Sequence, residues 1–177
     1  MNNNHVVLVN ERDEVIGTME KLEAHRVGHL HRAFSVMVIN SKGEILIQKR
    51  ASDKYHSGGL WSNTCCSHPR PGEDAFSSAV NRLQHEMGIT GVLKLEYHFI
   101  YKHQFKNGLT EYEFDYVFSC LSDQLPQINT KEVEEYAYVS YHKLKSAIEK
   151  EPEKYTVWFR EIVKKLDMSL FGLFVTT

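Results

Sequence analysis

Acidic and aromatic residues alternate along residues 111–118, which read Glu-Tyr-Glu-Phe-Asp-Tyr-Val-Phe. Side chains of an extended strand alternate between its two faces, so Glu111, Glu113 and Asp115 share one face. Two neighbouring carboxylates can bind a hard or borderline metal ion. The alternative is a solvated acidic face above an aromatic core face, and the alternation by itself leaves both interpretations open.

Histidine is abundant, with ten residues in the chain, and three of them fall close together at His25, His29 and His31. The two-residue spacing of His29 and His31 puts both on one face of an extended segment. His68 stands apart, in a stretch without periodicity. Imidazoles combined with carboxylates suit zinc, manganese or iron, and magnesium where oxygen ligands dominate. The cluster alone is a weak indication of a metal site.

Residues 61–69, Trp-Ser-Asn-Thr-Cys-Cys-Ser-His-Pro, are dense in reactive groups. A thiol beside a cation or a bound metal has a lowered pKa and can act as a base or nucleophile. The alternative is that Cys65 and Cys66 are buried and inert. Three cysteines are an odd number and two are adjacent, which argues against a disulfide scaffold and favours a reducing cytosol.

Arg82 and Glu86 form an i,i+4 pair on a predicted helix. A surface ion pair of this kind stabilises a helix by only about 0.2–0.5 kcal/mol, so stabilisation does little to explain the presence of this pair. Four scattered cations could together bind a diphosphate, for which the fork of donors on arginine is well suited. They are Lys21, Arg50, Lys54 and Arg82. Taken singly, such side chains are usually solvated.

Hydrophobic patterning and turn residues predict the elements that position these groups. The predicted strands are 6–10, 15–19, 33–39, 44–49, 93–105, 109–120 and 136–140, and the predicted helices are 74–87, 141–150 and 155–166. Residues 51–72 are expected to form a long loop, and Asn107-Gly108 a two-residue hairpin turn. Antiparallel runs with inserted helices indicate an α+β fold with mixed or antiparallel sheets flanked by helices, rather than a doubly wound parallel sheet.

Composition limits the class of protein. The 177 residues are 42% hydrophobic and 25% charged, which is typical of a globular chain and indicates one domain over 1–177. A net charge of −2 argues against nucleic-acid binding driven by the overall charge of the protein. No apolar run approaches the roughly 20 residues of a membrane span, and the first residues lack a signal-peptide pattern. We therefore expect a cytoplasmic protein with no nucleic-acid or membrane partner.

Residues 67–89 resemble a degenerate Nudix box. The matching positions are Glu73, Leu83, Glu86, Gly88 and Ile89. Ser67 replaces a glycine, Asn81 an arginine, and Arg82 and His85 two glutamates of the box. These replacements remove most of the carboxylates with which Nudix hydrolases hold metals and activate water, and so argue against hydrolysis.

The departures are similar to one branch of that superfamily, the type I isopentenyl-diphosphate isomerases. Residues 63–69 resemble the cysteine motif of that family, residues 111–113 its Glu-any-Glu motif, and His25 with residues 31–35 its metal-histidine segment. The motifs stand in the correct order, and the resemblance covers about residues 5–160. The tail after about residue 166 is left unassigned.

The resemblance implies a role for each site residue. One divalent metal, Mn²⁺, Zn²⁺ or Mg²⁺, would be bound by His25, His31, His68, Glu111 and Glu113. Glu86 would hold a Mg²⁺ ion bridged to the substrate diphosphate, which Lys21, Arg50, Lys54 and Arg82 would contact. Cys66 and Glu113 would be catalytic, Tyr101 would lie near the reacting carbons, and Trp158 would face a cationic intermediate. Without the resemblance, Trp158 reads equally well as a core aromatic.

The implied reaction interconverts isopentenyl diphosphate and dimethylallyl diphosphate, small prenyl diphosphates. The alternatives are a Nudix hydrolase of a nucleoside or prenyl diphosphate, and a non-catalytic, metal-stabilised binding module. One conflict accompanies the resemblance. A two-residue turn pairs Lys102 with Glu113 and points Tyr101 away from the carboxylates, because a slip of one residue reverses the faces. The resemblance therefore requires a longer loop or a bulge.

Overall fold

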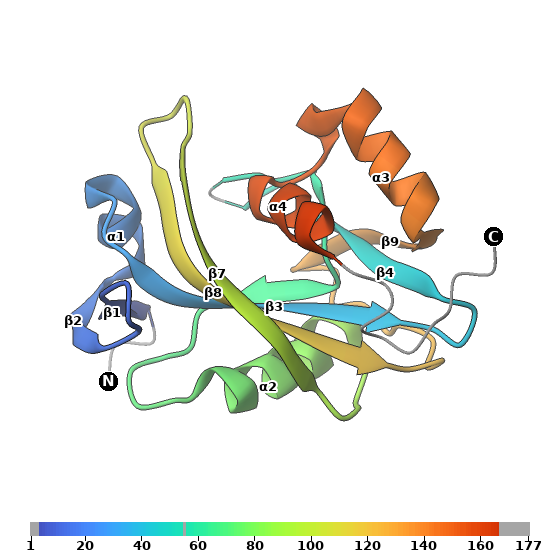
Figure 1. The fold of residues 1–177 in the computed structure, drawn as a ribbon, viewed down its shortest axis with the longest axis horizontal. Helices are drawn as coiled ribbons and strands as arrows, with labels where there is room; N and C mark the ends of the chain where they lie inside the picture. The colour runs from blue at the N-terminus through green and yellow to red at the C-terminus, as the bar shows by residue number, and fades with distance from the viewer. Residues whose placement is uncertain (1–3, 55, 167–177) are drawn as a thin grey trace.

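The computed structural model describes residues 4–54 and 56–166 (Figure 1). The strands are β1 His5–Val9, β2 Val15–Glu20, β3 His31–Ile39, β4 Glu44–Arg50, β5 Trp61–Ser62, β6 Cys65–Ser67, β7 Lys94–Gln104, β8 Thr110–Leu121 and β9 Val133–Ser140. The helices are α1 Lys21–Val27, α2 Ala75–Met87, α3 Tyr141–Lys150 and α4 Val157–Lys165, with a short 3₁₀ turn at Pro152–Lys154. The unassigned tail lies outside the described residues.

Strand β3 is the central strand of the sheet and pairs with four other strands. It pairs in parallel with β8 along its whole length, and antiparallel with β1, β4 and β6. The pairing with β4 is confined to Val38–Leu46 and Ile39–Ile45. Beyond that point the two strands diverge, and β6 pairs with β3 while β5 pairs with β4. The mixed sheet confirms the predicted α+β class, and the divergence opens a space in its middle.

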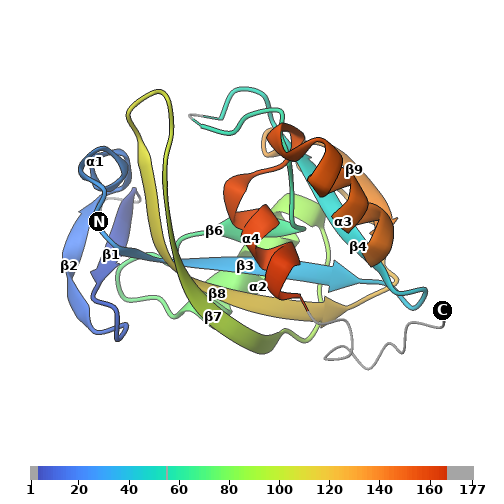
Figure 2. The same cartoon turned by 45° about the horizontal axis from the view of Figure 1, so that its top comes forward.

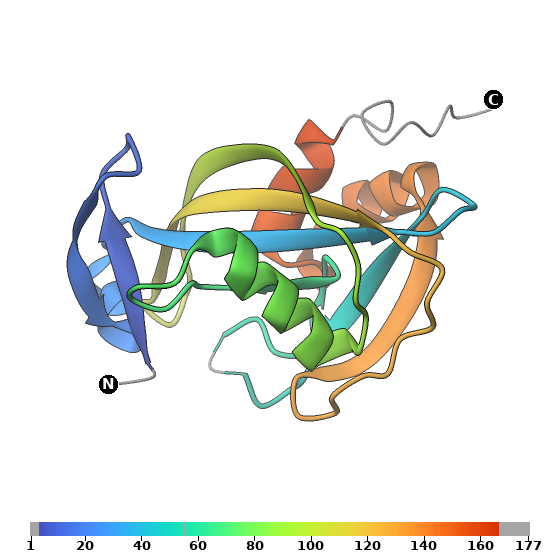
Figure 3. The same ribbon diagram turned by 90° about the horizontal axis from the view of Figure 1, so that it is seen from below.

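Helices cover both faces of the sheet. Figure 3 shows α2 on one side of β3 and β8, with α3 and α4 on the other. The core is divided accordingly: Val36, Leu46 and Cys65 pack with α2, whereas Met37, Ile45 and Val117 pack with α3 and α4. Alternating residues of one strand thus enter different cores, as the period of two requires. No helix within the described ranges is long and apolar enough to span a membrane.

The predicted helix 74–87 is present as α2, because its ends carry strong capping residues. Asp74 accepts a 2.8 Å hydrogen bond from the Ser77 amide, and Gly88 closes the helix with a φ of 66°. The other predicted strands and helices occur with ends displaced by no more than three residues. The sequence analysis missed α1, which is seven residues long, and the two short strands β5 and β6 inside the expected loop 51–72.

The predicted two-residue turn between β7 and β8 is wrong. The Phe105 amide bonds to the Leu109 carbonyl, so three residues, 106–108, form the loop, and Gly108 has a φ of 85°. A left-handed glycine after a turn is typical of three-residue hairpins. Figure 2 shows this hairpin projecting between α1 and α4. The extra residue shifts the register, so that Tyr101 pairs with Glu113.

Candidate active site

A cavity of about 160 Å³ opens where β3 and β4 diverge. Most of the predicted site residues line it: Lys21, Arg50, Lys54, Cys66, His68, Arg82, Glu86, Glu111, Glu113 and Trp158. The other three, His25, His31 and Tyr101, are buried and contact the two glutamates of β8. The ten lining residues come from six elements and two loops, so distant parts of the chain meet in one pocket.

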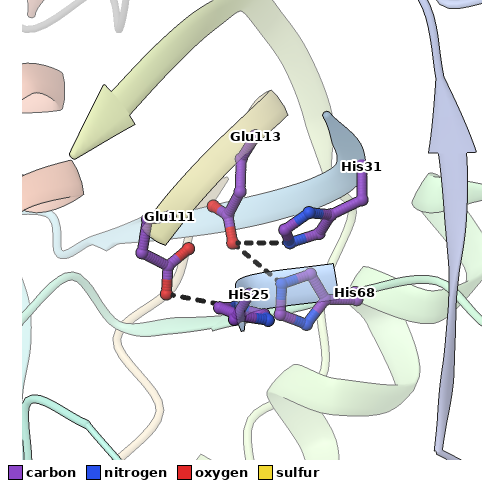
Figure 4. Close-up of side chains that lie close together, drawn as sticks. All are labelled: His25, His31, His68, Glu111 and Glu113. Carbon is purple, nitrogen blue, oxygen red and sulfur yellow. Dashed lines mark hydrogen bonds and ion pairs between the residues drawn. The ribbon is translucent and has the colours of Figure 1, made fainter. Parts of the chain in front are cut away.

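Three histidines and two glutamates form a tight cluster at one end of the cavity (Figure 4). One potential ligand atom from each of His25, His31, His68, Glu111 and Glu113 lies within 4.8 Å of all the others. His31 opens β3 directly opposite Glu113, whereas His25 comes from α1 and His68 follows β6. This donor set of imidazoles and carboxylates is one that zinc, manganese and related ions prefer.

Backbone carbonyls orient two of the imidazoles. Nδ1 of His25 lies 2.6 Å from the Lys21 carbonyl, and Nδ1 of His31 lies 2.8 Å from the His29 carbonyl. A carbonyl only accepts, so each Nδ1 carries the hydrogen and Nε2 faces the glutamates. Within the described residues, the buried Nε2 of His31 has no hydrogen-bond partner. Metal-binding histidines usually donate the hydrogen of their other ring nitrogen to a carbonyl in this way, so the residues fit a divalent ion.

The electrostatics of the cluster favour a cation. Burial disfavours the charged form of His25, but Glu111, the Lys21 carbonyl and Glu113 together outweigh this effect and raise the pKa of His25. Burial opposes ionisation of Glu111, yet contacts with His25 and His56 hold the pKa of Glu111 well below its usual range. Burial lowers the pKa of His68 to about 4, against the attraction of Glu113. A metal ion would take the place of the protons on this cluster.

The acidic face of β8 is not solvated, so that alternative is wrong. Glu111 is 2% exposed and Asp115 only 1%. Burial and the neighbouring Glu113 raise the pKa of Asp115 well above its usual range, and Ser35 donates a 2.9 Å hydrogen bond to Asp115. Burying three carboxylates on one strand is costly unless partners compensate them, and here histidines, a tyrosine and a serine do so.

Cys65 and Cys66 point to opposite faces of β6. Cys65 is fully buried in the core beside α2, whereas Cys66 lines the cavity on the α4 side. The sulfur of Cys66 lies 3.7 Å from a guanidinium nitrogen of Arg50. Burial raises the pKa of the Cys66 thiol to about 12, and the Arg50 guanidinium offsets only part of this rise. Cys66 is therefore a protonated thiol at neutral pH.

Four cationic side chains also line the cavity and form its cationic wall: Lys21, Arg50, Lys54 and Arg82. Arg50 has a buried Nε with no hydrogen-bond partner among the described residues, and its guanidinium carbon lies 5.2 Å from the centre of the Trp158 ring. Trp158 is fixed by a 3.0 Å hydrogen bond from its Nε1 to Ser62. It both packs in the core and lines the cavity, so the two interpretations of this residue are compatible.

Arg82 and Glu86 are not a solvated surface pair. Glu86 is buried, one of its oxygens is bound by Arg82, and the other accepts a 2.7 Å hydrogen bond from Gln48. Arg82 also contacts Glu132, another residue that lines the cavity. The Glu86 carboxylate is thus held at the cationic wall, where a magnesium ion on a diphosphate would find an oxygen ligand.

The sequence analysis missed two titratable residues that line the cavity, His56 and Glu132. Nε2 of His56 lies 2.7 Å from Glu111, and its ring stacks on Phe105 at 5.2 Å between centroids. Glu132 precedes β9 and binds Lys54 as well as Arg82. Each stands in a loop with no local pattern, and the high histidine count was the only available signal for His56.

The fold and the site together define a class of protein. The NUDIX domain family model matches residues 29–161, and the chain belongs to that family. The crystal structure of DR0079 from Deinococcus radiodurans superposes with a TM-score of 0.77 at 21% identity, covering 91% of this chain and 98% of that one. A C. elegans Ap4A hydrolase gives a TM-score of 0.58 at 16% identity, covering 80% and 98%. These two likenesses establish the fold.

The particular branch follows from closer relatives. An isopentenyl-diphosphate Delta-isomerase of Pectobacterium atrosepticum is 48% identical over 155 residues, which are 88% of this chain and 87% of that protein. A second such isomerase, from Photorhabdus laumondii, is 47% identical over 161 residues, 91% of each chain. Within the NUDIX family, the chain belongs to the isopentenyl-diphosphate Delta-isomerases.

Proposed function

We propose that this protein interconverts isopentenyl diphosphate and dimethylallyl diphosphate, and so supplies precursors for isoprenoid synthesis. The observation that carries the proposal is the position of Cys66 and Glu113. They come from β6 and β8, which pair with opposite edges of β3, and both line the cavity that also holds the five-residue cluster and the cationic wall. The names of the close relatives support the same activity.

The reaction requires an acid and a base on one substrate. The alkene is unactivated, so its terminal carbon must accept a proton to form a tertiary carbocation, and an adjacent carbon must then lose one. We propose that Cys66 and Glu113 exchange these protons, because a protonated thiol and a carboxylate are then available together. A pocket that excludes water protects the cation, and the face of Trp158 stabilises it.

We further propose two metal sites. The five-residue cluster of His25, His31, His68, Glu111 and Glu113 would hold one divalent ion, with Zn²⁺, Mn²⁺ and Mg²⁺ as the candidates. When bound, that ion would fix the charge and orientation of Glu113. Glu86 would hold a Mg²⁺ ion on the substrate diphosphate, which Lys21, Arg50, Lys54 and Arg82 would contact. The partner is then a small prenyl diphosphate.

Hydrolysis of a diphosphate is the weaker alternative. Two positions that carry glutamate in the Nudix box carry Arg82 and His85 here, and Arg82 is engaged in ion pairs with Glu86 and Glu132. A cationic side chain at such a position cannot bind a metal or activate water. The third alternative, a binding module, gives no reason for a protonated thiol beside the cluster. Three free cysteines support the proposed cytoplasmic location.

The test is direct. The purified protein is incubated with isopentenyl diphosphate and magnesium, and the products are separated by chromatography. We expect dimethylallyl diphosphate to form until the two isomers reach equilibrium, without release of phosphate. Release of phosphate or of a monophosphate ester would instead identify a hydrolase, and no change in the substrate would favour a binding module.

A further inference from the structure

Glu132 is a carboxylate placed among cations. It lies in the turn before β9, where its carbonyl accepts a 3.0 Å hydrogen bond from the Ala51 amide. Its Oε2 accepts hydrogen bonds from both Nζ of Lys54 and Nη2 of Arg82, the latter at 2.7 Å. The side chain is only 18% exposed and lines the cavity. One carboxylate oxygen therefore engages two of the cations proposed to contact the diphosphate.

The contacts of Glu132 with Lys54 and Arg82 do more than hold two loops together. Arg82 pairs with both Glu132 and Glu86, so two carboxylates that line the cavity contact the same guanidinium. Lys54 and Arg82 together hold the pKa of Glu132 below its usual range despite its burial. An ion pair outside the cavity, between Lys49 of β4 and Glu134 of β9, already joins this part of the chain to β9.

The position of Glu132 weakens the binding of a magnesium-free diphosphate. Such an anion would compete with Glu132 for Lys54 and Arg82. The Glu132 carboxylate would then lose part of its pairing with these cations, and its negative charge would repel the diphosphate oxygens beside it. A magnesium ion on the diphosphate removes this penalty, because it reduces the charge of the ligand and is attracted by Glu86 and Glu132. Carboxylate oxygens together with phosphate oxygens are its preferred surroundings.

We propose that Glu132 makes the cavity select the magnesium complex of a diphosphate over the magnesium-free anion. The inference rests on the proposed function only in taking a diphosphate as the ligand of the cationic wall. Glu132 is then a specificity-determining residue, and it does not contact the reacting carbons.

Calorimetric titration of the full chain with inorganic diphosphate tests this proposal. Each titration is run in excess magnesium and in magnesium-free buffer, and the metal content of the protein is measured before and after to detect stripping. The wild type should bind diphosphate more tightly with magnesium. In Glu132→Gln the ratio of the two dissociation constants should fall by about tenfold or more, chiefly because the magnesium-free anion binds better.

Two further variants make the result specific. Glu132→Asp keeps the charge and should keep most of the preference for magnesium. Glu134→Gln makes the same substitution two residues away, in a pair outside the cavity, and should leave the ratio unchanged. An unchanged ratio in Glu132→Gln, with both affinities altered by the same factor, would overturn the inference alone. A wild type that binds no diphosphate in either buffer would contradict the proposed substrate class as well.

Discussion

The hydroxyl of Tyr101 donates a 2.6 Å hydrogen bond to Oε2 of Glu113, the residue directly opposite it on the neighbouring strand. The same hydroxyl lies 3.4 Å from Glu111. Burial and the surrounding carboxylates raise the pKa of Tyr101 well above its usual range, so the hydroxyl stays protonated and keeps donating. Tyr101 thus fixes the carboxylate that we propose to exchange a proton with the substrate.

Replacing Tyr101 with phenylalanine should lower turnover by about 10- to 100-fold, because a hydrogen bond to a charged group contributes about 1.5–3 kcal/mol. The measurement is the steady-state rate of isomerisation. Tyr97→Phe is the matched control on the same strand, since the Tyr97 hydroxyl bonds to the Ile162 carbonyl in the core, and it should keep its turnover. Equal rates in wild type and Tyr101→Phe would show that this bond does not act in catalysis.

Removing one carboxylate of the cluster should weaken the metal site. In Glu111→Gln we expect faster loss of the divalent ion to a chelator and a parallel loss of activity, because an anionic ligand becomes neutral. Metal content is measured by mass spectrometry during dialysis. Glu44→Gln, whose carboxylate contacts Asn40 at a turn, is the control. Full occupancy after replacing both Glu111 and His31 would refute the ligand assignment.

The metal-free protein should lose stability in acid through His68. Its pKa is about 4 when folded and near 6.5 when unfolded, so the unfolded state binds the extra proton first as the pH falls. The free energy of unfolding should therefore drop by about 2–3 kcal/mol between about pH 7 and pH 4.5 on account of this residue. Urea unfolding of His68→Gln should show a drop smaller by that amount, whereas His142→Gln, an exposed control, should behave as wild type.

The two adjacent cysteines should give opposite phenotypes. Cys66→Ala should lower turnover by about 100- to 10,000-fold, the usual contribution of a general acid or base, with little change in melting temperature. Cys65→Ala should keep most of the turnover but lose stability, because it leaves a gap in the core beside α2. If Cys65→Ala is the less active variant, the proposed assignment of the thiol fails.

The local hydrophobic pattern predicted most of the helices and strands. The positions of the site residues, however, depend on pairing between strands that are distant in the sequence. Alternation placed Glu111 and Glu113 on one face, yet only the histidines of α1 and β3 explain why that face is buried. The position of Tyr101 depended on a single loop residue, because Asn107-Gly108 fits a two-residue turn as well as the observed three-residue loop. That difference reverses every side chain of β7.

The roles of single loop residues could not be predicted from sequence patterns. His56 and Glu132 have no periodic neighbours, and their roles arise from contacts across 55 and 50 residues of sequence, with Glu111 and Arg82. The sequence left open whether Cys66 is an activated thiol or a buried one, because the burial that raises the pKa of this thiol comes from contacts with distant parts of the chain. The α1 helix was missed because it spans only two turns, too short to show a helical period.

Isomerisation in heavy water tests the central claim most directly. The protein is incubated with isopentenyl diphosphate and magnesium in deuterium oxide, and the product is examined by NMR. We expect dimethylallyl diphosphate that carries deuterium in the methyl group formed from the terminal alkene carbon, and almost none of it with Cys66→Ala or Glu113→Gln. Product without solvent deuterium, or normal deuterium uptake in Cys66→Ala, would contradict a proton exchange between these two residues and the substrate.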